Sequence, residues 1–139
     1  MTSEVFLDTA FAIALSVATD EHHKRAEELA DQLEAAATHL VTTRAVLLEI
    51  GNALSKQRYR PAAVELLTAM EQDGQVEIVP LSEELYERAF ELFCHRLDKE
   101  WGFVDCVLFI VMQERGLTAA LTTDEHFEQA GFRALLRGR

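Results

Sequence analysis

The chain has 139 residues, 49% of them hydrophobic, and a formal net charge of −11 at pH 7. This length suits one domain with its own core, so we expect residues 1–139 to form a single domain. The acidity excludes a protein that grips nucleic acid through bulk basic charge. It does not exclude an enzyme whose bound cations reverse the electric field locally.

The first seventeen residues and the two cysteines bear on location. Residues 1–17 lack a basic start, and Asp8 interrupts their apolar run, so we expect a strand and a helix rather than a signal peptide. No apolar stretch approaches the roughly 18–20 residues that a membrane span needs. Cys94 and Cys106 have no zinc-binding spacing and are expected to be buried thiols. The sequence therefore predicts a cytoplasmic protein with no membrane contact.

In the first half of the chain, short apolar runs alternate with helical patterns. Thr9, Thr42 and Thr43 are expected to cap helices, and Pro61 suits a first helical turn. The expected elements are a strand at 4–7, helices at 9–17 and 22–37, a strand at 39–41, a helix that ends at 54, and a helix at 61–70.

The second half continues the alternation. Ser82 is expected to cap a helix, Gly116 to end one, and Thr122 with Glu125 to form a capping box. The expected elements are a strand at 75–79, helices up to 97 and at 104–114, a strand at 117–121, a short helix at 124–129 and an edge strand at 132–135. This order predicts an α/β fold with a mainly parallel sheet of four to five strands and helices on both faces.

Two acidic residues directly follow predicted strands. Asp8 follows the first strand and Asp124 follows the fourth. Ligands of parallel α/β sheets bind beyond the carboxyl ends of the strands, so both side chains are expected at the same edge. The alternative is a purely structural role, in which such an acid only caps the next helix.

Two further acids interrupt apolar helices. Glu49 and Asp105 have apolar neighbours on most sides, and Asn52 shares the helical face of Glu49. An isolated ionised carboxylate is costly in such surroundings unless it is paired or bound to a metal. Arg44 or Arg96 could supply the pairing. Four acids in these places otherwise fit Mg²⁺ or Mn²⁺, which prefer oxygen ligands and support phosphodiester hydrolysis.

Basic and aromatic residues lie near these acids in sequence. Trp101 and Phe103 either stack an unpaired base or pack their loop, with packing favoured. His126 is expected mainly at a helix surface. Candidates for a basic rim that contacts RNA phosphates are Lys56, Arg58, Arg60, Arg96 and Lys99.

The whole pattern resembles the PIN-domain family and, within it, the VapC-type toxins. The stretches that carry the resemblance are VFLDTAF at 5–11, TTRAVLLEIGNAL at 42–54, WGFVDC at 101–106 and TTDEHFEQAGF at 122–132. The resemblance implies a three-layer α/β/α sandwich and metal-dependent cleavage of single-stranded RNA. It also implies a homodimer and an antitoxin partner, although solitary relatives exist.

The resemblance places the catalytic and metal-binding roles on Asp8, Glu49, Asp105 and Asp124. Neighbouring positions that match substrate-binding or supporting residues of the family are Thr9, Asn52, Asp98 and Thr123.

Two other readings stay open. One is a non-catalytic interaction module with the same fold. The other is a Mg²⁺-binding receiver-type signalling domain, which would need an acidic pair after the first strand and a Lys after the last one. Here Asp8 stands alone and that Lys is missing.

Overall fold

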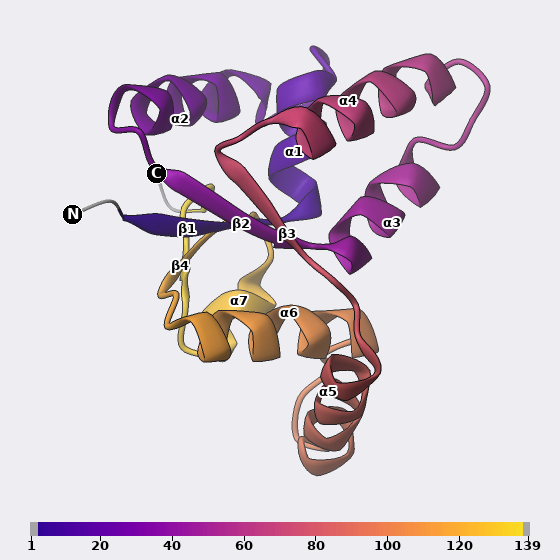
Figure 1. The fold of residues 1–139 in the computed structure, drawn as a ribbon, viewed down its shortest axis with the longest axis vertical. Helices are drawn as coiled ribbons and strands as arrows, with labels where there is room; N and C mark the ends of the chain where they lie inside the picture. Colours follow the sequence, from indigo (N-terminus) through magenta and orange to yellow (C-terminus); the bar gives the residue numbers. More distant parts are fainter. Residues whose placement is uncertain (1–2, 138–139) are drawn as a thin grey trace.

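A central sheet covered by helices on both faces organises the computed structural model, which describes residues 3–137 (Figure 1). The strands are β1 (Glu4–Leu7), β2 (His39–Thr43), β3 (Val76–Val79), β4 (Ala119–Leu121) and β5 (Arg133–Ala134). The helices are α1 (Thr9–Ser16), α2 (His23–Ala35), α3 (Arg44–Ala53), α4 (Arg60–Gln72), α5 (Glu83–His95), α6 (Phe103–Arg115) and α7 (Glu125–Gln129).

The five strands are all parallel and lie in the order β3-β2-β1-β4-β5. β1 is central, and its Phe6 aligns with Val41 on one side and Ala120 on the other. Helices α1, α2 and α4 lie over one face, and α6 and α7 over the other (Figure 1). The predicted three-layer α/β/α fold with a parallel sheet is therefore confirmed.

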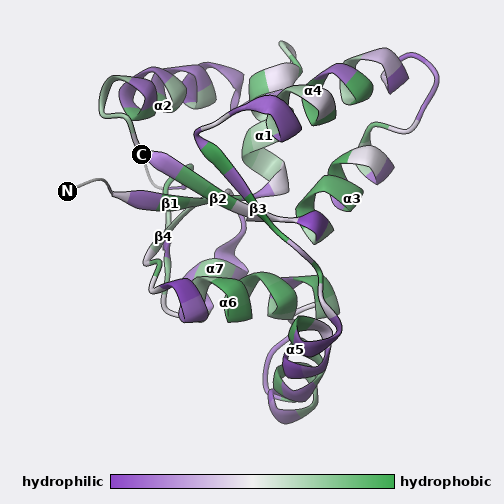
Figure 2. Ribbon diagram, in the orientation of Figure 1, coloured by the Kyte–Doolittle hydropathy of each residue, from purple (hydrophilic) through white to green (hydrophobic). Residues whose placement is uncertain are grey.

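Helix α6 forms the middle of the second helical layer. Every residue from Cys106 to Met112 is buried, because the sheet covers one side of the helix and α5 packs on another. Figure 2 shows the resulting hydrophobic colouring along most of α6. The apolar sequence predicted this burial, which fixes the start of α6 against the sheet.

The strand ends position the site. Leu7, the last residue of β1, aligns with Leu121, the last residue of β4. The backbone N–H of Asp8 donates to the carbonyl of Leu121 at 3.3 Å, and the Thr42 hydroxyl donates to the carbonyl of Leu7 at 2.8 Å. The segments after β1 and β4 are thereby held together at the carboxyl edge, where α3 and the start of α6 also lie (Figure 1).

Several local predictions need correction. Thr9 does not cap α1, because its hydroxyl donates to Glu49 instead. Asp124, not Thr122, caps α7 by accepting from the backbone N–H of His126. Strand β2 extends to Thr43, whose side chain does cap α3. β4 and β5 are shorter than expected, and Cys94 is exposed rather than buried.

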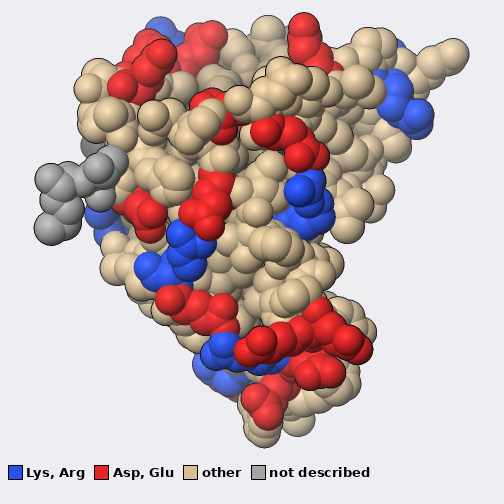
Figure 3. Space-filling view, in the orientation of Figure 1, with Lys and Arg blue, Asp and Glu red and all other residues tan. Residues whose placement is uncertain are grey.

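Acidic side chains dominate much of the surface. On the face in Figure 3 they gather over α5 and over helices α2 and α4. Within residues 3–137, no helix has both the length and the apolar character needed to cross a membrane.

Candidate metal centre

An open cleft of about 730 Å³ lies at the carboxyl edge of the sheet. The four acids predicted from sequence all line it, although they come from four separate segments of the chain. The lining residues are Asp8, Thr9, Ala10, Glu49, Asn52, Ala53, Asp105, Thr123 and Asp124.

Asp8 lies deepest, with 7% of its surface exposed. Its Oδ2 accepts a hydrogen bond from the Thr122 hydroxyl at 2.7 Å, and that hydroxyl accepts from the backbone N–H of Asp124 at 3.0 Å. Thr122 therefore orients one acid and ties it to the segment that carries another. The pKa of Asp8 is raised from 3.8 to about 6, mainly by burial and also by the neighbouring Glu49 and Asp124, against the opposing effect of the Thr122 hydrogen bond.

Glu49 projects from α3 into the cleft and is half-buried. Its Oε1 accepts a hydrogen bond from the Thr9 hydroxyl at 2.8 Å, which fixes the side chain against α1. Burial is the main cause that raises the pKa of Glu49, and the charges of Asp105 and Asp124 add to it. These two carboxylates therefore face Glu49 closely enough to oppose its ionisation.

Asp105, Asp124 and His126 form the tightest group. Each offers one ligand atom, and these atoms lie within 4.8 Å of one another. His126 Nδ1 lies 3.2 Å from Asp105 Oδ2 and 3.4 Å from Asp124 Oδ1. Asp105 Oδ2 also accepts from the backbone N–H of Gly102 at 3.0 Å. The sequence expectation of His126 at a helix surface missed this contact.

The alternative pairing of the helical acids with arginine is wrong. Arg44 pairs with Glu71 at 2.7 Å, and Arg96 pairs with Asp98 at 2.9 Å. Glu49 and Asp105 are also less buried than predicted, because both face the open cleft.

The other predicted residues divide between the cleft and the surface. Thr9, Asn52 and Thr123 line the cleft with the acids. Asp98 and Arg96 do not line it and form an exposed ion pair with each other, which lowers the pKa of Asp98 to about 2.

The predicted basic rim is dispersed. Arg60 donates to the carbonyl of Ser55, and the Arg58 guanidinium lies over the Tyr59 ring. Lys56 is exposed on the loop that leaves α3, and Lys99 is half-buried in the loop before α6. None of these side chains lines the cleft.

Trp101 and Phe103 pack in the structure. Trp101 is buried, meets the Phe109 ring edge-on at 5.0 Å, and donates through Nε1 to Gln129. Phe103 stacks on Phe93 of α5 with ring centroids 5.4 Å apart. The favoured interpretation of loop packing is therefore confirmed.

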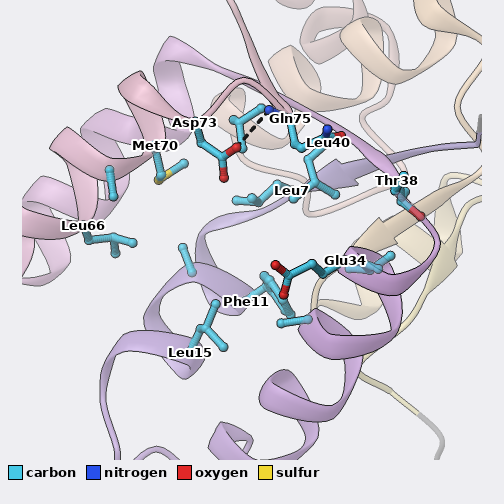
Figure 4. Close-up of a pocket in the computed structure, with 16 residues that line it drawn as sticks. Leu7, Phe11, Leu15, Glu34, Thr38, Leu40, Leu66, Met70, Asp73 and Gln75 are labelled. Atoms are coloured by element: carbon cyan, nitrogen blue, oxygen red, sulfur yellow. Dashed lines mark hydrogen bonds between the residues drawn. The ribbon is translucent and has the colours of Figure 1, made fainter.

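A second cavity, of about 550 Å³, lies among α1, α2, α4 and the sheet (Figure 4). Its lining is mostly apolar and includes Leu7, Phe11 and Met70, with the carboxylates of Glu34 and Asp73 among them. It holds no cluster of groups suited to hydrolysis, so the acidic cleft is the candidate site.

The cleft fits a hard divalent cation. It gathers oxygen donors from four carboxylates, and no lysine or arginine among the described residues lines it to balance their charge. Burial is the main cause of the raised pKa of Asp8 and Glu49, and a bound cation would relieve the mutual repulsion that adds to it. The imidazole of His126 adds a nitrogen donor that Mn²⁺ tolerates better than Mg²⁺.

Fold and site together define a class: parallel α/β proteins whose strand ends assemble a carboxylate site for a divalent metal. Comparison with known proteins makes the class specific. Residues 5–133 match the family model of the PIN domain. The chain is 30% identical over 128 residues to the 23S rRNA-specific endonuclease VapC20 of two Mycobacterium tuberculosis strains, covering 92% of this chain and 95% of that protein.

Solved structures agree. The crystal structure of Mycobacterium tuberculosis VapC20, described as a sarcin-ricin loop cleaving toxin, matches with a TM-score of 0.80 at 30% identity, over 92% of this chain and 95% of that one. VapBC2 from Rickettsia felis, bound to a DNA fragment from their promoter, matches with a TM-score of 0.68 over 94% and 96%. Its 15% identity shows the fold alone. This chain belongs to the PIN-domain family, as its motifs predicted.

Family membership also bears on one of the two alternative interpretations. A receiver-type signalling domain is not supported, because the match to the PIN domain spans residues 5–133.

Proposed function

We propose that this protein is a divalent-metal-dependent endoribonuclease that hydrolyses phosphodiester bonds of single-stranded RNA. The observation that carries the proposal is the cleft in which Asp8, Glu49, Asp105 and Asp124 converge in a PIN-family chain. The likeness to an rRNA-specific endonuclease over nearly the whole chain supports RNA as the substrate class.

The side chains divide the work of holding the cation and the substrate. Four carboxylates would hold Mg²⁺ or Mn²⁺: those of Asp8, Glu49, Asp105 and Asp124. A bound cation would supply an activated water and neutralise charge on the scissile phosphate. Thr122 fixes the orientation of Asp8, and Thr9 fixes that of Glu49.

Asn52 is the polar side chain best placed to meet the RNA. It is exposed, lines the cleft one helical turn after Glu49, and its amide can donate to a phosphate or sugar oxygen.

The partners follow from the same likeness. The related VapC20 is described as a toxin, which supports a role for this protein as the toxin of a toxin-antitoxin pair, or as a solitary relative of such toxins. An antitoxin protein would then be its partner, and the cytoplasm its location. We also propose a homodimer, because α5 and the residues just after it carry a row of exposed apolar side chains at helical spacing: Tyr86, Phe90, Phe93 and Leu97.

The test is cleavage of a panel of single-stranded RNAs, with a ribosomal RNA fragment among them, by purified protein with Mn²⁺, with Mg²⁺ or with EDTA. We expect cleavage that requires the metal and falls at least 100-fold in Glu49→Gln, because one carboxylate of a catalytic site is lost. Single-stranded DNA of the same sequences measures the preference for RNA.

Intact RNA in every metal condition would contradict the proposal. Unchanged cleavage by Glu49→Gln would place the chemistry elsewhere and favour an interaction module with a contaminating nuclease. Another variant on α3, Leu48→Ala, is the matched control, because Leu48 is exposed and does not line the cleft.

A further inference from the structure

A pocket of about 540 Å³ lies beside α7, next to the last described residues of the chain. Three arginines from distant parts of the sequence line it: Arg25 from α2, Arg133 from β5 and Arg137 just after β5. Glu128 of α7 is the acidic residue among the lining side chains. In a chain with a net charge of −11, such a concentration of guanidinium groups is unexpected.

The charges in this pocket are only partly balanced. Arg137 Nε donates to Glu128 Oε1 at 3.1 Å. Arg25 Nη1 lies 3.7 Å from Glu28, a distance too long for a good hydrogen bond. Among residues 3–137, Arg133 forms no ion pair, so positive charge is in excess around the pocket.

Arg25 also carries a buried donor that lacks an acceptor. Arg25 Nε is buried and is the one buried side-chain donor or acceptor in residues 3–137 that has no hydrogen-bond partner. A buried donor without a partner costs about 1–3 kcal/mol, so such groups usually meet a water or a ligand. The outer Nη atoms of a guanidinium suit the oxygens of a phosphate, which they can bind in pairs.

Arg137 connects the pocket to the acidic cleft. Its Nη1 donates to the carbonyl of Thr123 at 3.3 Å, and Thr123 lines the cleft beside Asp124. The basic pocket and the acidic cleft are therefore neighbours, because a residue that lines the pocket hydrogen-bonds to a residue that lines the cleft.

We propose that this pocket, formed by Arg25, Arg133 and Arg137, binds a backbone phosphate of the RNA strand to one side of the bond that is cut. The inference rests on the proposed ribonuclease function and deepens it. Metal and acids would handle the scissile phosphate, while the guanidinium groups anchor a neighbouring one and fix the direction of the strand. The basic residues chosen from sequence serve this purpose less well, because Arg96 is neutralised by Asp98 and Arg60 is bonded to a carbonyl.

The experiment compares Arg133→Gln and Arg25→Gln with wild type and with Arg44→Gln. Arg44 is a matched control for charge, because it is exposed on α3, pairs with Glu71, and lines neither the cleft nor the pocket. Cleavage kinetics use an RNA that the wild type cuts, and binding is measured by fluorescence anisotropy of the same labelled RNA in Ca²⁺ at several salt concentrations.

We expect each pocket variant to raise KM and the dissociation constant about tenfold, while kcat changes less than twofold. The slope of log binding constant against log salt should become shallower by up to about 0.7, the value for one phosphate of a single strand. Arg44→Gln should match wild type in all three measurements.

Pocket variants that match Arg44→Gln in KM, binding and salt slope would overturn the inference. If Arg25→Gln fails to fold, the exposed Arg133 carries the test alone. A third outcome separates the two proposals: the wild type binds RNA without cutting it, and Arg133→Gln loses that binding. This result would overturn the proposed catalytic function and leave the phosphate pocket supported.

Discussion

At the scale of single residues, Asp8 is the most buried of the four acids and has Glu49 and Asp124 as acidic neighbours. The sequence directed attention to Glu49 and Asp105, because their neighbours along the chain are apolar. Burial in the structure follows the cleft instead: the helical acids face its open side, and Asp8 lies at its floor. The residues next to an acid in sequence indicate whether its helix is buried. The exposure of the acid's own side chain depends on how elements that are distant in sequence pack around it.

The raised pKa of Asp8 leads to a prediction about stability without metal. The pKa of this carboxyl rises from 3.8 to about 6 on folding, so below pH 4 it does not change the free energy of unfolding. As pH rises through 6 the carboxyl ionises in the folded state as well, and its full destabilising effect is then present. The cost at pH 8 is about 3 kcal/mol, from about 1.4 kcal/mol per pKa unit. We therefore expect Asp8→Asn to be more stable than wild type at pH 8 in EDTA, and close to it at pH 4.

Urea unfolding at both pH values measures this difference. Because only the change between the two proteins is compared, the contributions of titrating groups that do not contact Asp8 cancel. An Asp8→Asn protein that is less stable than wild type at pH 8 in EDTA would show that the ionised Asp8 does not destabilise the folded state.

His126 gives a second prediction at this scale. Its Nδ1 contacts both Asp105 and Asp124, so it either binds the cation or holds two of its ligands in place. In either role, His126→Ala should weaken Mn²⁺ binding about 10-fold to 100-fold, as measured by calorimetry. His95→Ala is the control, because His95 is exposed on α5 and its Nδ1 contacts the backbone carbonyl of Glu91, away from the cleft. Equal Mn²⁺ affinity in the two variants would exclude His126 from the site.

At the scale of elements, the sequence predicted the order of strands and helices, because turn residues and caps are local signals. Gly116 illustrates this: it ends α6 with φ of 67°, a conformation that glycine adopts readily. The acids at 8 and 124 could be placed at one edge because parallel strands align their carboxyl ends. The bond from Thr122 to Asp8 could not be predicted, because it joins residues 114 positions apart.

Helix α5 gives a prediction about assembly. Tyr86, Phe90 and Phe93 remain 41–52% exposed, and Leu97 just beyond the helix is 90% exposed. A row of this kind at intervals of three and four residues is the face by which helices pair. We expect Phe90→Glu to convert a dimer to a monomer in light scattering. Val64→Glu, which changes an equally exposed residue on α4, should leave the mass unchanged. A wild type that is monomeric at micromolar concentration would contradict the homodimer.

At the scale of the whole molecule, the separation of charge explains how an acidic chain can act on an anionic polymer. The acids of the cleft would bind a cation, those over α5 (Figure 3) would repel RNA from that surface, and the arginines around the pocket beside α7 would attract it. The strand should therefore run from the cleft toward α7 and away from α5. Sequence alone predicted the acidic site but not this path, since Arg25, Arg133 and Arg137 meet only in the folded chain.

The central claim is that the four carboxylates hold the divalent metal. It is tested most directly by anomalous diffraction from crystals soaked in Mn²⁺. We predict one or two anomalous peaks within coordination distance of Asp8, Asp105 and Asp124, which are absent from crystals of Asp8→Asn. A cleft without a peak at saturating Mn²⁺, or a peak that persists in Asp8→Asn, would contradict the account.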